Sequence, residues 1–263
     1  MRLPASRPVP EAPDHKGFAH LIVVHPPFAA PVLPDQRPSE TPDHDPEAAR
    51  ATVLGLSTVS AVRRERAPSR LALPKSPVRR KDLDEVSVAV WGSTVKITDP
   101  ALVEGGMESG ALEDEFRAQK ERYPEALIVA VCSLNFRFHY TKLLAAAPNT
   151  PDVKIEGRWS LQTTGEPRAV LAAAGVDLDE LDAEYGDEFA PEHKDDDGGG
   201  LRDFDGFLHM LTGGALGVYP DEERVHSTFV VMRSKHGKDC LRRIWLPIGA
   251  RRTMLRLLGY RNQ

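Results

Sequence analysis

The prolines of this chain are concentrated toward its N-terminus, which limits where a packed core can begin. Fourteen of the 22 prolines lie between residues 4 and 77 of the 263-residue sequence. Proline fixes φ, lacks an amide donor and restricts the residue before it, so such a run disfavours helices and central strands. We therefore expect residues 1–82 to form a proline-rich extended arm with a basic linker. We expect residues 83–263 to form a single folded domain.

One apolar segment interrupts the predicted arm. Phe18 and the run from Leu21 to Val24 precede His25-Pro26-Pro27-Phe28. This pattern predicts a short edge strand laid on the core. The alternative is a docking peptide for a protein partner, because a preformed extended segment loses little entropy on binding.

Charges are also unevenly distributed, although the formal net charge is only −5. Residues 63–81 carry eight bases and one acid, residues 152–205 carry 16 acids and five bases, and residues 233–261 carry nine bases and one acid. Within the acidic part, residues 187–206 predict a surface loop. We expect no metal there, because an EF-hand alignment of this loop lacks the bidentate glutamate.

The remaining sequence mixes strand and helix patterns. Gly92-Ser93 and His236-Gly237 separate strand-like runs and predict two hairpins. Regular βαβ alternation is absent, so the pattern indicates an α+β fold with a mostly antiparallel sheet and helices packed on one face. Strands are predicted over residues 86–91, 94–98, 126–132, 134–140, 152–161, 225–233 and 239–246, and helices over residues 48–64, 109–122, 141–147, 167–174 and 250–258.

A polar row is predicted on the strand over residues 134–140. Alternation places Asn135, Arg137 and His139 on one face, with about 7 Å between successive residues. Such a row has the chemistry to hold a phosphate or a carboxylate. The alternative is the solvent face of an amphipathic strand.

The basic C-terminal part carries the strongest functional signal. Elements that are adjacent in sequence are usually adjacent in space, so its bases are expected to form one exposed anion-binding surface on the second hairpin and the final helix. The alternative is neutralisation within the molecule by the acidic residues 152–205. The predicted anion-binding residues are Arg233, Lys235, Lys238, Arg242, Arg243, Arg251, Arg252 and Arg256.

These patterns favour a non-catalytic interaction protein that binds an anionic partner, first of all nucleic acid. A structural subunit tethered by its arm to a larger assembly is one alternative, and an enzyme acting on a phosphorylated substrate is another. No catalytic residue is assigned, and no cofactor or metal is expected, because zinc-ligand spacing and a P-loop lysine are absent.

The sequence also indicates where the protein resides. No apolar run approaches the length of a membrane span, so we expect a soluble, intracellular and cytoplasmic protein without a membrane partner. Cys132 and Cys240 lie in apolar runs and are expected to be buried free thiols in a reducing compartment.

Overall fold

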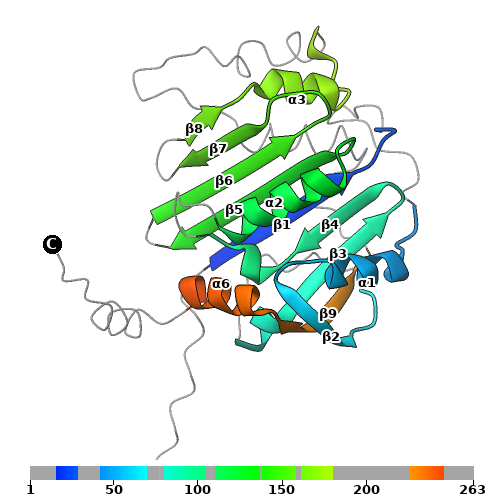
Figure 1. Cartoon of the computed structure of the whole chain (residues 1–263), viewed down its shortest axis with the longest axis vertical. Helices are drawn as coiled ribbons and strands as arrows, with labels where there is room; N and C mark the ends of the chain where they lie inside the picture. The colour runs from blue at the N-terminus through cyan, green and yellow to red at the C-terminus, as the bar shows by residue number, and fades with distance from the viewer. Residues whose placement is uncertain are drawn as a thin grey trace, which may run out of the picture.

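The structure, a computed structural model, describes residues 16–28, 42–69, 77, 80–104, 110–136, 138–157, 161–179 and 225–245. In these ranges the chain forms a nine-stranded sheet in the order β2-β9-β3-β4-β1-β5-β6-β7-β8 (Figure 1). Every neighbouring pair is antiparallel. The strands are β1 (Lys16–Val24), β2 (Val59–Glu65), β3 (Glu85–Trp91), β4 (Thr94–Thr98), β5 (Leu127–Phe136), β6 (Phe138–Ala146), β7 (Val153–Gly157), β8 (Leu161–Thr164) and β9 (Ser227–Arg233).

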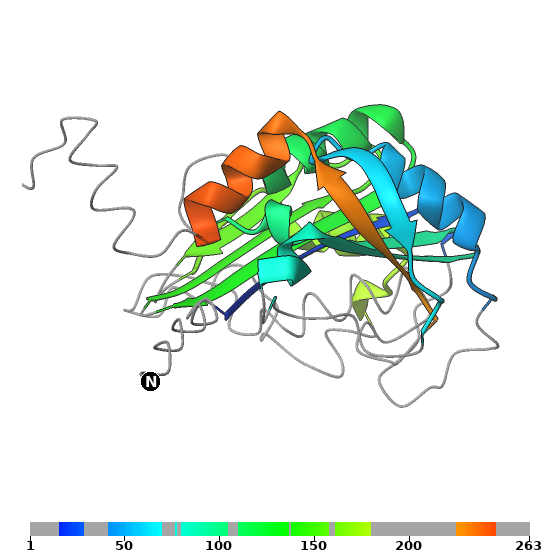
Figure 2. The ribbon, with the colours of Figure 1, turned by 90° about the horizontal axis from the view of Figure 1, so that it is seen from below.

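Helices cover both faces of this sheet (Figure 2). Helices α1 (Pro46–Leu54), α2 (Ala111–Arg122) and α6 (Lys235–Trp245) share a core with Leu21 of β1, and we call their side the helical face. Helix α3 (Pro167–Ala173) packs instead with Ile22 on the opposite face. Successive residues of a strand point to opposite faces, so neighbours in β1 belong to different cores. The expected mixed fold with a large antiparallel sheet is confirmed, but the expectation of helices on one face is corrected by α3.

Strand β1 is central, so the predicted edge strand is wrong. It pairs with β4 on one side and β5 on the other, and Leu21 and Ile22 are both buried. A strand that is almost wholly apolar is suited to burial on both faces, and Pro26 and Pro27 follow the strand without interrupting it. This segment is therefore part of the core and is not available as a docking peptide.

Other described parts of the first 82 residues also belong to the fold. Helix α1 packs on the helical face, and β2 pairs with β9. Because β1 and β2 lie on either side of β3 and β4 in the sheet, they are structurally continuous with the part of the chain that follows residue 82.

Several sequence predictions are confirmed. β3 and β4 form the first predicted hairpin, whose turn has Gly92 at φ 54°. α2 and α3 form where helices are expected. β5 forms where a strand is predicted over residues 126–132, and its apolar residues there are buried.

The predicted single strand over residues 134–140 is wrong. β5 ends at Phe136 and β6 begins at Phe138, and the two strands pair antiparallel with Asn135 opposite His139. A period of two continues unchanged through this reversal, so alternation alone cannot reveal it. β6 also occupies residues 141–146, where a helix was expected.

The second predicted hairpin is also wrong, because the segment after β9 is helix α6. Ser234 caps this helix: its Oγ accepts a hydrogen bond from the Gly237 amide (3.0 Å). Gly237 and Cys240 are buried, and Leu241 and Ile244 are half-buried, which is the spacing of one helix face. The N-cap serine and this period were the signals for a helix.

Candidate functional site

Helix α6 is fixed to the segment that leads into β2. The Ser234 amide donates to the Thr58 carbonyl oxygen (3.1 Å), and the Ser234 hydroxyl donates to the Ser57 carbonyl oxygen (2.7 Å). Gly237 lies so close that a Cβ atom there would be 2.3 Å from the Thr58 oxygen. The first turn of α6 therefore has a defined position on the protein.

The solvent side of α6 is basic. Lys235, Lys238, Arg242 and Arg243 are all exposed. Asp239 is the acid on this side, and its Oδ1 lies 3.5 Å from Nη1 of Arg242, whose side chain is 68% exposed. An exposed pair of this length contributes little. Four cations against one carboxylate leave three excess positive charges on what we call the α6 basic face.

Arg233, which was predicted to belong to this surface, is buried. Its Nη1 donates to Oδ1 of Asp99 (2.7 Å), and its Nη2 donates to the carbonyl oxygen of Leu83 (2.6 Å). Oδ2 of Asp99 accepts from the Thr58 hydroxyl (2.5 Å). Arg233 continues the row of buried β9 residues Phe229 and Val231 on the helical face. The expectation that Arg233 lies on the exposed surface is therefore wrong.

The other predicted site residues lie wholly or partly outside the described residues. Arg251, Arg252 and Arg256 are outside the described ranges, as is Arg137. The side chains of Asn135 and His139 are not described either, but their backbones face each other across β5 and β6. The row along one strand is therefore corrected to a cross-strand pair.

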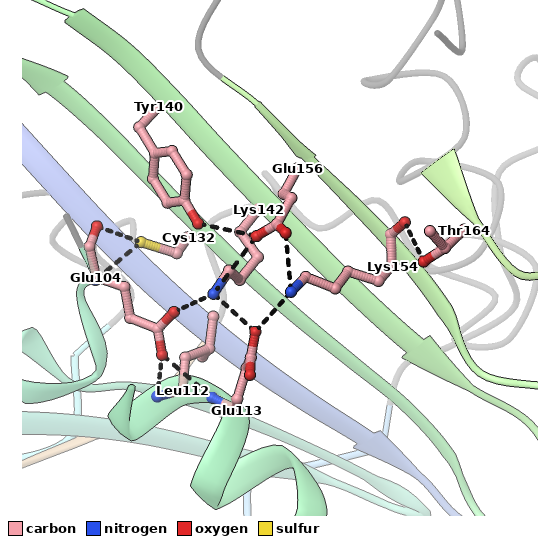
Figure 3. Close-up of polar contacts among 9 residues, drawn as sticks. All are labelled: Glu104, Leu112, Glu113, Cys132, Tyr140, Lys142, Lys154, Glu156 and Thr164. Atoms are coloured by element: carbon pink, nitrogen blue, oxygen red, sulfur yellow. Dashed lines mark hydrogen bonds and ion pairs between the residues drawn. The ribbon is translucent and has the colours of Figure 1, made fainter. Parts of the chain in front are cut away.

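A second polar group was missed by the sequence analysis: a buried lysine among carboxylates (Figure 3). Lys142 of β6 is 0% exposed. Its Nζ lies 2.5 Å from Oε2 of Glu104, 2.8 Å from Oε1 of Glu113 and 3.7 Å from Oε2 of Glu156. These carboxylates come from the segment before α2, from α2 and from β7.

Two further side chains complete this group. Nζ of Lys154 lies 3.1 Å from Oε1 of Glu113 and 2.8 Å from Oε1 of Glu156. The Tyr140 hydroxyl donates to Oε2 of Glu156 (3.2 Å). The Lys142 network is the name used below for Glu104, Glu113, Tyr140, Lys142, Lys154 and Glu156.

Glu104 also caps α2. Its Oε1 accepts hydrogen bonds from the amides of Leu112 (2.9 Å) and Glu113 (3.3 Å). Gly110 occupies the N-cap position and has no side chain to do this. The Lys142 network thus joins the start of α2 to β6 and β7.

The protonation states argue against a nucleophile in this network. Burial by itself lowers the pKa of Lys142, but its hydrogen bonds to Glu104 and Glu113 outweigh this and raise it. Burial raises the pKa of the neighbouring Cys132 thiol to about 12. A charged ammonium and a protonated thiol are both poor nucleophiles. Among the described residues, no group of His, Cys, Asp and Glu side chains is arranged to hold a metal ion.

The sequence carries only a weak signal for this network. Lys142 directly precedes the apolar run from Leu143 to Ala147, and a single lysine there is also compatible with a helix. The register Lys142↔Glu156 depends on pairing β6 with β7. Glu104 and Lys142 are 38 residues apart in the chain, so local spacing could not reveal this contact.

Comparison with known proteins places the chain in a family. Residues 3–248 match the model of a family described as a family of unknown function, DUF6333. The chain belongs to DUF6333. No curated protein and no solved structure matches this DUF6333 chain. In the part of the chain that the structure describes, no helix is long and apolar enough to cross a membrane.

Proposed function

We propose that this DUF6333 protein is a non-catalytic interaction protein. It binds an anionic partner through the α6 basic face, and nucleic acid is the first candidate for that partner. The observation that carries the proposal is the exposure of Lys235, Lys238, Arg242 and Arg243 on one side of a single helix. Lysine and arginine in such an array bind phosphates by charge and release condensed counterions.

The dimensions of α6 support this proposal. A helix rises about 1.5 Å per residue, so Lys235 and Arg242 are about 10 Å apart along the axis. Double-stranded DNA carries one phosphate charge for about every 1.7 Å of its axis. The cations of α6 therefore have the reach to contact several phosphates at once.

The packing of α6 favours a polyanion over a membrane surface. An amphipathic helix binds lipid by burying its apolar side in the bilayer. In this protein that side already packs on the protein, where Gly237 and Cys240 are buried. Only the charged side remains for a partner.

A binding measurement with duplex DNA and structured RNA at low salt tests the proposal. The wild-type protein is expected to bind, with an affinity that falls steeply as salt increases. Replacing Lys235, Lys238, Arg242 and Arg243 by glutamine, which keeps a good helix propensity, should abolish most of this binding without unfolding the protein. Failure of the wild-type protein to bind either nucleic acid at low salt would overturn the proposal.

A further inference from the structure

Strand β2 (Val59–Glu65) is an end strand of the sheet (Figure 1). Among the described residues it pairs with β9 alone, so one side of its backbone faces away from the sheet. We call this side of Val59–Glu65 the β2 edge. The amides and carbonyl oxygens along such an edge form a template on which a further strand can pair.

The β2 edge carries two arginines that have no ion-pair or hydrogen-bond partner among the described residues. Arg63 and Arg64 are both exposed. The neighbouring acid, Glu65, is engaged elsewhere. Its Oε2 lies 3.6 Å from Nη1 of Arg50, and its Oε1 accepts a hydrogen bond from the Ser227 hydroxyl (3.3 Å). The two guanidinium groups are therefore available to carboxylates of a partner, which arginine binds with paired, charge-assisted hydrogen bonds.

A register shift separates the apolar and basic side chains of β2. Val62 lies opposite Val231 and Arg64 lies opposite Val230, so Arg63 is an extra residue on β2. Without it, Val62 and Arg64 would share a face of the sheet. Val62 instead packs with the core of the helical face, while Arg64 shares the opposite face with Val230.

The charge of the β2 edge selects against a second copy of this chain. A second copy would bring its own arginines to the same edge, and like charges on facing strands destabilise their pairing. An acidic strand supplies the opposite charge. The other end strand, β8 (Leu161–Thr164), has no charged residue, so this selection is particular to β2. A peptide also matches the edge better than a nucleic acid does, because its backbone offers amides and carbonyl oxygens at strand spacing.

We propose that the β2 edge binds an extended acidic peptide of a partner protein, which adds to the sheet as a further strand. Backbone hydrogen bonds to β2 supply affinity, and Arg63 and Arg64 select acidic side chains. Alternate residues of an extended peptide lie on one face, so acids at alternate positions face the arginines together. The inference is independent of anion binding by α6.

Binding of short synthetic peptides to the full chain tests the inference. The probe alternates glutamate and valine. One comparison peptide has lysine in place of each glutamate, and another has proline in place of each valine. The probe should bind, the lysine peptide should not, and the proline peptide should bind about tenfold or more weakly because proline lacks the amide donor. Equal binding of the probe and the proline peptide, or no binding of the probe, would overturn the proposal.

The double variant Arg63→Gln with Arg64→Gln tests the charge selection. It should weaken probe binding by about two- to fivefold for each arginine removed, without unfolding the protein, because both side chains are exposed. The matched control is Arg242→Gln with Arg243→Gln on α6, which should bind the probe like the wild type. Equal weakening by both variants, or none by the β2 variant, would contradict the inference. A wild-type protein that binds the probe but not DNA would instead overturn the proposed function alone.

Hydrogen exchange locates the bound peptide. Amide exchange in β2 should slow when the probe is added, whereas β8, the other end strand, should keep its rate. Protection at β8 or α6 without protection at β2 would overturn the proposal. A peptide-free protein that forms dimers with β2 already protected would also overturn it, because a second copy would then occupy the edge.

Discussion

The Lys142 network and the α6 basic face use the same kinds of residues in opposite settings. Lys142 is 0% exposed and contacts carboxylates from three other parts of the chain, whereas Arg242 is 68% exposed and has one weak ion pair within its own helix. A buried charge requires fixed partners, and losing one of them is costly. An exposed charge interacts weakly within the protein and stays available to a ligand.

Arg233 shows that sequence position does not decide between these settings. It lies two residues before Lys235, yet its guanidinium contacts Asp99 and the Leu83 carbonyl oxygen inside the protein. The bases of the C-terminal part therefore do not all belong to one surface, and burial is what separates a structural charge from one that can bind a partner.

The largest expected effect is that of Lys142→Met. Removing the ammonium leaves three carboxylates with Lys154 as the remaining cation of the network, which should lower the free energy of unfolding by about 3–5 kcal/mol at neutral pH. Urea denaturation measures the loss. A loss below about 1 kcal/mol would show that the network does not hold buried charge, and the contrast with α6 would disappear.

Arg233→Met should have the next largest effect. Asp99 is 0% exposed and would keep the Thr58 hydroxyl and the Ala101 amide, but no cation. We expect a loss of about 3 kcal/mol in thermal or urea unfolding. Adding Asp99→Asn should recover part of it, because the unpaired charge is then gone. Arg242→Met is the exposed control and should change stability by less than about 0.5 kcal/mol.

Gly237→Ala should have an intermediate effect. Its new Cβ would lie 2.3 Å from the Thr58 carbonyl oxygen, so α6 must shift away from the segment that leads into β2. Overpacking of this kind costs about 1–3 kcal/mol. Lys238→Ala, one residue later on the exposed side, is the control and should be nearly neutral. Equal effects at both positions would contradict the close packing of α6.

The parts of the fold that could be predicted from sequence are those with a local cause. The turn at Gly92, the helix before Tyr123 and the apolar run of β5 each have a signal within a few residues. The central position of β1 depends on strands 70 or more residues away, and proline content around it pointed to an arm.

The candidate site divides in the same way. The exposed lysines and arginines of α6 were identified from composition, although their secondary structure was not. The burial of Arg233 and the assembly of Glu104 with Lys142 require β9, α2 and β6 to be in place. No spacing in the sequence contains that information.

The central claim is that the exposed arginines of α6 bind an anion, and two adjacent arginine pairs allow a direct test. Arg242-Arg243 lies on α6 and Arg63-Arg64 lies on β2, and all four residues are exposed. The measurement is the salt dependence of duplex DNA binding for the wild-type protein and for each double glutamine variant. The account predicts that the α6 variant binds more weakly, with a salt slope reduced by about 0.9 for each phosphate that it no longer neutralises, while the β2 variant matches the wild type. Equal weakening by both variants, or a wild-type affinity that does not depend on salt, would contradict it.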